Sequence, residues 1–249
     1  MEKNEIIRLL EKARYAHRGL HKKPEIPENS MHAFRLAIEE GFGIEMDVHL
    51  TADDKLAVIH DSSLKRTSGV DLLIEEISLE RAQRFFLEKS EETIPDFEEV
   101  LKLTDGKVPL IIELKTASGN TSALCQRVVD ALEGYNGLYC IESFDPSVVK
   151  WLRDNRPDLV RGQLAGGLRK SGDVNIKRSH DFLLRSLLVN LVGKPDFVAY
   201  KYSDIDAAAF RKYKGAKFTW TVKFYEDMKN AESKGIAVIF EQFNPKDYE

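Results

Sequence analysis

Short apolar runs alternate with amphipathic segments of helical spacing along most of the chain. The runs have the length and composition of buried strands. We predict strands in the run that ends at His17, in the run around Glu45, and at 109–115, 139–144, 160–166, 196–202, 217–222 and 237–243. We predict helices at 3–12, from Ser30 to Gly41, and at 96–104, 121–133, 146–154, 180–191, 206–213 and 225–233. Eight strands that alternate with helices predict an α/β protein with a (β/α)8 TIM barrel rather than an open sheet.

Residues 61–95 interrupt this alternation. They contain a turn around Gly69 and one short amphipathic helix near residues 78–87. We predict a small subdomain inserted after the second strand of a single barrel domain that spans residues 1–249. Little sequence follows the eighth strand, so we expect the helix at 3–12 to pack across the N-terminal end of the barrel.

The strand around Glu45 carries charged residues at every second position. Glu45, Asp47 and His49 therefore project from one face, while the apolar residues between them project from the other. Glu113 and Lys115 repeat this spacing on a later strand. Carboxylates at such a separation raise each other's pKa unless a cation lies between them, so the pattern predicts a metal or a basic partner.

Charged and aromatic residues gather at the C-terminal ends of the predicted strands, which is the face where barrel enzymes build their sites. These residues are His17, Glu45, Asp47, Glu113, Lys115, Glu142 and Trp220. Three of them, Glu45, Asp47 and Glu113, form an all-oxygen site. Such a site favours a hard divalent ion, Mg²⁺ or Ca²⁺, over Zn²⁺.

Basic residues and histidines beside this site favour phosphoester chemistry. Arg18 and Lys115 add fixed positive charge, and a metal ion, a guanidinium and an ammonium together suit a phosphate group. His17 and His60 are candidates for the general acid and base. The sequence leaves open which of the two is the acid.

Other residues of the same types receive structural interpretations. We interpret His21, His32, His49 and His180 as surface or packing residues, with the alternative that His49 lines the site because it continues the carboxylate face. For Trp220 a substrate wall and a core role are both open.

The composition limits the partners. The chain has 249 residues, of which 43% are hydrophobic, so it can bury a large core. A net charge of −4 gives no general attraction to nucleic acid or anionic membranes. One basic cluster is interpreted as a solvated loop, with capture of anionic substrates as the alternative. The cluster consists of Arg169, Lys170, Lys177 and Arg178.

The cysteines and the N-terminus indicate a cytoplasmic protein. Cys125 and Cys140 have no metal-ligand spacing and are interpreted as buried thiols of a reducing compartment. No apolar run approaches the roughly 20 residues that span a bilayer, so we expect no stable membrane insertion. The first residues are too charged for a signal-peptide core.

Six short motifs occur in a fixed order. They are HRG at 17–19, PENS at 27–30, E-x-D at 45–47, HD at 60–61, L-x-RT-x-G at 64–69 and E-x-K at 113–115. Together with IESFDP, WTV and FNP farther along, they resemble the glycerophosphodiester phosphodiesterases of the bacterial cytoplasmic type. The resemblance implies a barrel with an insertion after strand two. It also implies metal-dependent hydrolysis of a small-molecule glycerophosphodiester to sn-glycerol 3-phosphate and an alcohol.

The resemblance also implies roles for individual residues. The roles are catalysis for His17 and His60, metal binding for Glu45, Asp47 and Glu113, and phosphate contact for Arg18 and Lys115. Apart from the resemblance, we predict Glu142 and Trp220, which lie at strand ends, as further substrate-binding residues. Three departures from the family pattern lie in the second half of the chain. They are Lys223 where Asn is common, Glu142 where Gln is frequent, and Glu241-Gln242-Phe243 in place of Thr-Asp-x. We expect them to alter the mouth of the site and the leaving-group specificity rather than the metal centre.

Two other functions are considered. A related phosphodiesterase could act on lysophospholipids or polymeric glycerophosphates, and an apolar patch at Phe85, Phe86 and Leu87 would favour it. A non-catalytic barrel that binds phosphorylated metabolites is the second, although no histidine or metal carboxylate is lost. A homo-oligomer stays an open alternative, as does a cyclic phosphate intermediate instead of direct attack by water.

Overall fold

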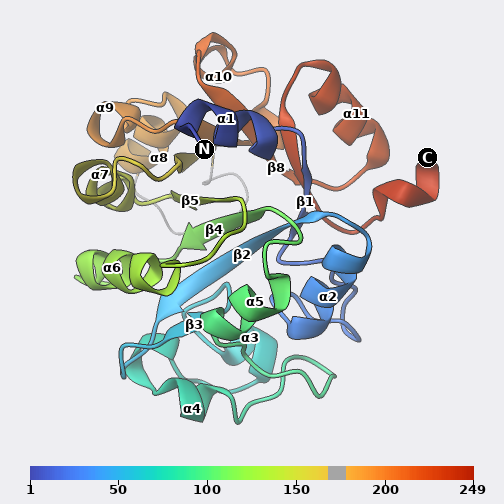
Figure 1. The fold of residues 1–249 in the computed structure, drawn as a ribbon, viewed down its shortest axis with the longest axis vertical. Coiled ribbons are helices and arrows are strands. Elements are labelled where there is room, and N and C mark those ends of the chain that lie inside the picture. The colour runs from blue at the N-terminus through green and yellow to red at the C-terminus, as the bar shows by residue number, and fades with distance from the viewer. Residues whose placement is uncertain (168–177) are drawn as a thin grey trace.

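Eight parallel strands close into a barrel with helices around it (Figure 1). The computed structural model describes residues 1–167 and 178–249. The strand order is β1-β9-β8-β7-β6-β5-β4-β2, and β1 pairs with β2 to close the ring. This confirms the predicted (β/α)8 barrel. The barrel strands are β1 (Arg14–His17), β2 (Gly43–Leu50), β4 (Leu110–Leu114), β5 (Tyr139–Ser143), β6 (Arg161–Ala165), β7 (Phe197–Lys201), β8 (Ala216–Val222) and β9 (Ala237–Phe240).

The helices around the barrel begin and end close to the predicted positions, with one exception. The hydroxyl of Ser30 caps its helix by accepting a hydrogen bond from the Ala33 N–H at 3.1 Å. The helix predicted at 180–191 is wrong in its length, because Leu187 has a left-handed φ of +59° that splits it into α8 and α9. The helices around the barrel are α1 (Lys3–Leu10), α2 (Met31–Glu39), α5 (Phe97–Thr104), α6 (Thr121–Ala131), α7 (Pro146–Asn155), α8 (Arg178–Arg185), α9 (Asn190–Gly193), α10 (Ala208–Lys212) and α11 (Tyr225–Ser233). The 3-10 turns η2 (Tyr202–Asp204) and η3 (Pro245–Tyr248) lie between or after these helices.

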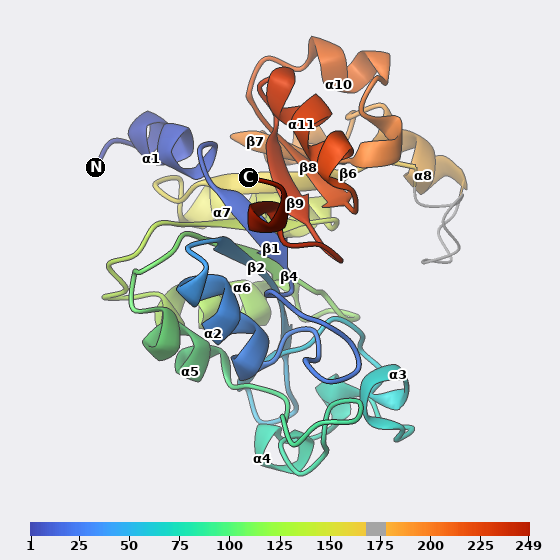
Figure 2. The same cartoon turned by 90° about the vertical axis from the view of Figure 1, so that its right-hand side faces the viewer.

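The barrel strands contribute side chains to two separate apolar clusters. Alternate residues of β2, such as Ile44 and Met46, pack outward in the large cluster between barrel and helices. A second cluster contains Tyr15, Ile111 and other strand residues together with Leu10 of α1, which is buried. Helix α1 therefore packs on the barrel as predicted, and Figure 2 places it on the opposite side of the molecule from α3.

The segment after β2 forms a small unit with its own apolar cluster. Strand β3 (Leu56–Val58) pairs antiparallel with β2, and α3 (Lys65–Ser68), η1 (Ile74–Glu76) and α4 (Leu79–Ala82) follow it. Helix α4 is shorter than the helix expected near 78–87. The cluster beneath them includes Leu64, Ile74, Leu79, Leu87 and Ile94.

The apolar patch expected at Phe85, Phe86 and Leu87 is not an exposed patch. Leu87 is buried and Phe85 packs against the cluster of the insertion, while Phe86 alone of these is exposed. His49 links β2 to the insertion, since its Nδ1 lies 2.7 Å from Glu75 and its Nε2 lies 3.1 Å from the His60 carbonyl. This position fits a packing residue.

The structure does not test the predictions for His180, for the basic cluster or for the cellular location. The side chains of His180 and of the predicted basic cluster at 169–178 lie outside the described residues. Among the helices of residues 1–167 and 178–249, none has the length and apolar character needed to cross a membrane. A cytoplasmic location stays a prediction.

Candidate active site

The register of the barrel aligns polar residues of neighbouring strands. Asp47 of β2 lies beside Glu113 of β4, and Glu113 lies beside Glu142 of β5. On the other side of β2, Glu45 lies beside His17 of β1. Parallel neighbours at matched positions project to the same face, so these side chains gather inside the C-terminal end of the barrel.

Three of the carboxylates converge. Oxygens of Glu45, Asp47 and Glu113 all lie within 4.8 Å of one another, and all three residues are buried. Burial, together with the charges of Asp47 and Glu113, raises the pKa of Glu45 well above its usual value. Burial also raises the pKa of Glu113, to about 7. Because the donors are all carboxylate oxygens, this site fits a hard divalent cation, which would relieve the repulsion between them.

Two cations already compensate part of this charge. The Nζ of Lys115 lies 2.8 Å from Glu113 and 3.0 Å from Asp47. The Nε of Arg18 lies 3.3 Å from Asp47, and the Arg18 backbone N–H donates to Glu45 at 3.0 Å. Burial alone would raise the pKa of Asp47, but Lys115 and other nearby cations outweigh burial and hold it well below its usual value. The predicted phosphate contacts therefore lie against the predicted metal ligands.

Glu241, just after β9, fixes the ring of His17. Its Oε2 lies 2.7 Å from His17 Nδ1. Burial would raise the pKa of Glu241, but hydrogen bonds from its neighbours hold it far below the usual value, so the carboxylate is ionised and can only accept. The proton of the His17 ring therefore sits on Nδ1. Burial and the charge of Arg18 lower the pKa of His17 to about 4, so Nε2 keeps a lone pair, 3.9 Å from Glu45.

His60 is held in the same manner by its neighbour. Its Nδ1 lies 2.6 Å from Asp61, whose other oxygen accepts from Arg66 at 2.5 Å. Burial would raise the pKa of Asp61, but the hydrogen bonds from His60 and Arg66 lower it, so Nδ1 of His60 is again the donor. Burial lowers the pKa of His60. Both histidines line one pocket, and each has a carboxylate behind its ring.

Two buried residues of the PENS motif, Glu28 and Asn29, also contact the site, although we predicted no role for them from the sequence. Glu28 accepts hydrogen bonds from Arg18 at 2.8 Å and Arg66 at 2.6 Å, so it orients both guanidinium groups. Asn29 donates to Asp47 at 2.8 Å. The sequence did contain a signal for them. An acid and an amide follow Pro27 in the loop after β1, on the same side of the barrel as His17.

Comparison with known proteins shows the family of this chain. The sequence model of the glycerophosphoryl diester phosphodiesterase family matches residues 17–243. The chain belongs to this family. The glycerophosphodiester phosphodiesterase of Caldanaerobacter subterraneus subsp. tengcongensis is 31% identical over 233 residues, which cover 89% of this chain and 90% of that protein. That of Bacillus altitudinis is 38% identical over 130 residues, so the match spans about half of each protein, 49% of this chain and 52% of the relative.

A solved structure shares the fold of this family member. A phosphodiesterase of Oleispira antarctica, solved in complex with the product sn-glycerol-3-phosphate, superposes with a TM-score of 0.76 over 94% of each chain. The two sequences are 19% identical, so the likeness is one of fold.

The pocket of this chain that holds the two histidines has an aromatic wall. Trp220 lines the pocket and donates its Nε1–H to the Ala199 carbonyl at 3.1 Å. Its ring packs edge-on against the ring of Phe144, with the ring centroids 5.4 Å apart. Trp220 is thus both a pocket wall and a packed residue. Glu142 lies in the same pocket, and its buried Oε2 has no hydrogen-bond partner within the described parts of the chain. Burial, with Glu113 next, raises the pKa of Glu142 well above its usual value.

The departures from the family pattern reach deeper than the expected mouth of the site. Glu241 contacts His17 directly, and Lys223 lies 3.0 Å from the second oxygen of Glu241. The expectation that the departures would act at the mouth is therefore wrong for Glu241, and also for Glu142, which is buried beside Glu113. The sequence could not show the contact between Glu241 and His17, because it joins residues at opposite ends of the chain.

Proposed function

We propose that this protein hydrolyses glycerophosphodiesters to sn-glycerol 3-phosphate and an alcohol, with a divalent metal ion, Mg²⁺ or Ca²⁺, and a pair of histidines. One observation carries the proposal. A single pocket is lined by the two histidines, two of the three converging carboxylates and both predicted phosphate contacts. The membership of the family supports the reaction type.

The residues of this pocket divide the work between charge and proton transfer. Glu45, Asp47 and Glu113 would hold the metal ion, which when bound supplies positive charge to a phosphate oxygen. Arg18 and Lys115 add fixed charge where negative charge develops at phosphorus. These two cations are oriented by buried carboxylates, so they need little reorganisation when a substrate binds.

Proton transfer falls to the ring nitrogens that face the pocket. In His17 and His60 a carboxylate holds Nδ1, which leaves Nε2 of each ring for the reacting groups. One ring, unprotonated on Nε2, takes a proton from the nucleophile, and the other, which must carry a second proton on Nε2, delivers that proton to the leaving alkoxide. The aromatic wall of Phe144 and Trp220 would exclude water from one side of the phosphate.

The test is release of glycerol 3-phosphate from a panel of substrates with and without chelator. We expect release from glycerophosphodiesters with small alcohols, loss of activity in excess EDTA, and recovery when Mg²⁺ or Ca²⁺ is added back. Lysophospholipids in the same panel test the related activity, which loses the support of an exposed apolar patch because Leu87 is buried. Binding without turnover would favour a non-catalytic barrel, and equal rates with chelator would contradict the metal.

Glu241 gives a further prediction, because it fixes the tautomer of His17. Replacing Glu241 with Leu should lower kcat roughly 10- to 100-fold with little change in KM, by analogy with the loss of a carboxylate that holds a metal-ligating histidine. Glu241→Gln keeps an acceptor for Nδ1 and should recover much of the rate. Steady-state kinetics of both variants check this. Equal losses in the two variants would contradict this, because they would show that a neutral acceptor cannot replace the carboxylate.

A further inference from the structure

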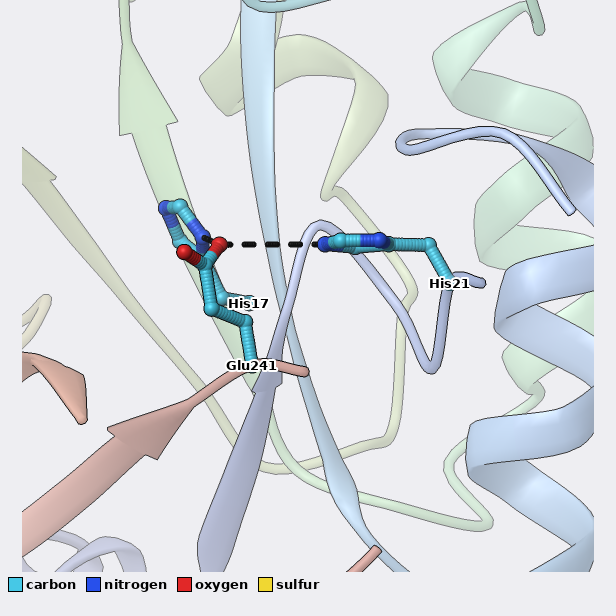
Figure 3. Close-up of side chains that lie close together, drawn as sticks. All are labelled: His17, His21 and Glu241. Atoms are coloured by element: carbon cyan, nitrogen blue, oxygen red, sulfur yellow. Dashed lines mark hydrogen bonds and ion pairs between the residues drawn. The ribbon is translucent and has the colours of Figure 1, made fainter. Parts of the chain in front are cut away.

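A second group of metal-ligating side chains lies beside the carboxylate site. Ligand atoms of His17, His21 and Glu241 all lie within 4.8 Å of one another. Oxygen Oε2 of Glu241 is 2.7 Å from Nδ1 of His17 and 3.8 Å from Nε2 of His21. Figure 3 shows the carboxylate between the two rings. None of the three residues belongs to the set of converging carboxylates.

The backbone brings these residues together in a definite way. His17 ends β1, and the chain turns sharply at Arg18 and Gly19, whose φ angles are +56° and +78°. A Cβ on Gly19 would lie 2.9 Å from Ala33, so the turn requires glycine. This turn returns His21 to the side of His17, and β9, the neighbour of β1, delivers Glu241. The cluster is thus built on two adjacent strands of the barrel.

The donors differ in kind from those of the carboxylate site. Two imidazole nitrogens and one carboxylate oxygen suit Zn²⁺ and similar transition-metal ions, whereas Mg²⁺ and Ca²⁺ prefer oxygen. Donor atoms of a tetrahedral zinc site lie about 3.4 Å apart when the metal–ligand bonds are about 2.1 Å long. The observed 2.7 and 3.8 Å lie on either side of that value, so small side-chain movements would complete the site. Water would supply the fourth ligand.

We propose that His17, His21 and Glu241 form a second metal site that takes Zn²⁺ or a similar transition-metal ion, and that its occupation inhibits the enzyme. The zinc–nitrogen bond uses the lone pair of Nδ1, so the Nδ1 proton moves to Nε2 and the ring stays neutral. Nε2 then carries a proton and faces the pocket as a donor. The proposed inhibition by zinc rests on the proposed role of His17 in hydrolysis. The proposed binding of zinc does not depend on that role.

Lys223 opposes this binding. Its ammonium lies 3.0 Å from Oε1 of Glu241, whereas the two histidines contact Oε2. The side chain is about half exposed, at 47%, so it can move away when a metal ion binds. Removing this charge by Lys223→Ala should therefore tighten zinc binding.

Binding is tested where the carboxylate site is weakened. In a Glu113→Gln background we expect one equivalent of Zn²⁺ by calorimetry or by competition with a chromophoric chelator. Adding His21→Ala should weaken this binding more than about 100-fold, while adding His32→Ala, a histidine of α2 outside the cluster, should not. Unchanged zinc affinity in the His21→Ala variant would overturn the site.

Activity separates this inference from the proposed function. With Mg²⁺ saturating, micromolar Zn²⁺ should inhibit the wild type, and a zinc chelator should restore the rate. His21→Ala should keep the basal rate and lose most of the zinc sensitivity. Zinc that binds through His21 without slowing hydrolysis would overturn the inhibition and the role of His17, but not the site. Hydrolysis with Mg²⁺ but no zinc binding would overturn this inference alone.

Discussion

Replacing Asp47 with Asn, or Glu45 or Glu113 with Gln, is expected to lower kcat at least about a thousandfold. Loss of the metal removes several kcal/mol of charge stabilisation, and each 1.4 kcal/mol is about tenfold in rate. The three side chains converge within 4.8 Å, so each amide removes one donor from the same site. Activity is measured with Mg²⁺ and with Ca²⁺ over a wide concentration range, because a weakened site needs more metal.

The same substitutions should leave the metal-free protein folded, and Glu113→Gln should make it more stable at neutral pH. The folded-state pKa of Glu113 is raised from its usual 4.5 to about 7 by burial. Between these values the folded protein keeps a proton that the unfolded chain loses, so a rise in pH through this range costs wild-type stability. The cost is of the order of 3 kcal/mol, at about 1.4 kcal/mol per pKa unit.

Denaturation with urea in EDTA at several pH values measures this difference. The partly buried His17 and His60, whose pKa values are lowered, act in the opposite direction, so the quantity to follow is the unfolding free energy of the variant minus that of the wild type. It should grow in favour of Glu113→Gln from pH 4.5 to about 7 and then level off. Asp196→Asn, at the start of β7 and so at the other end of the barrel, is the matched control for activity and should turn over normally. Collapse of all three site variants without metal would assign these carboxylates to structure.

The predictable parts of the site are those carried by strand periodicity. Glu45 and Asp47 alternate with buried apolar residues, and this alternation alone places both inside a barrel. Glu113 follows from the same pattern on β4. Barrel geometry then brings the C-terminal ends of these strands together, so the pattern of the strands is enough to group the three predicted metal ligands.

The residues that were missed act across long distances in sequence. Glu241 and His17 are 224 residues apart, and only the closure of the barrel by β9 and β1 brings them into contact. His21 lies in a turn, where no periodicity shows which way a side chain points. The split between α8 and α9 was missed for a related reason, since a left-handed Leu187 leaves no trace in an apolar pattern.

Replacing His17 or His60 with Ala is expected to lower kcat by roughly 10²- to 10⁴-fold, the usual loss when a general acid or base is removed. The carboxylates behind the rings should remain, since Glu241 also pairs with Lys223 and Asp61 with Arg66. Far-UV circular dichroism should therefore show an unchanged fold. His32→Ala serves as the matched control and should keep the wild-type rate.

The leaving group then tells the acid from the base. A nitrophenyl ester of glycerol phosphate needs little protonation when its alcohol departs, so the variant that lacks the general acid should recover much of its rate on that substrate. The variant that lacks the base should not, because the nucleophile must still lose its proton. A carboxylate holds Nδ1 of each ring in the same way. We therefore expect the two variants to differ only in how far the nitrophenyl ester restores their rate. Near wild-type turnover of both variants on natural glycerophosphodiesters would exclude the histidine pair, and equal recovery on the nitrophenyl ester would exclude the division of roles between them.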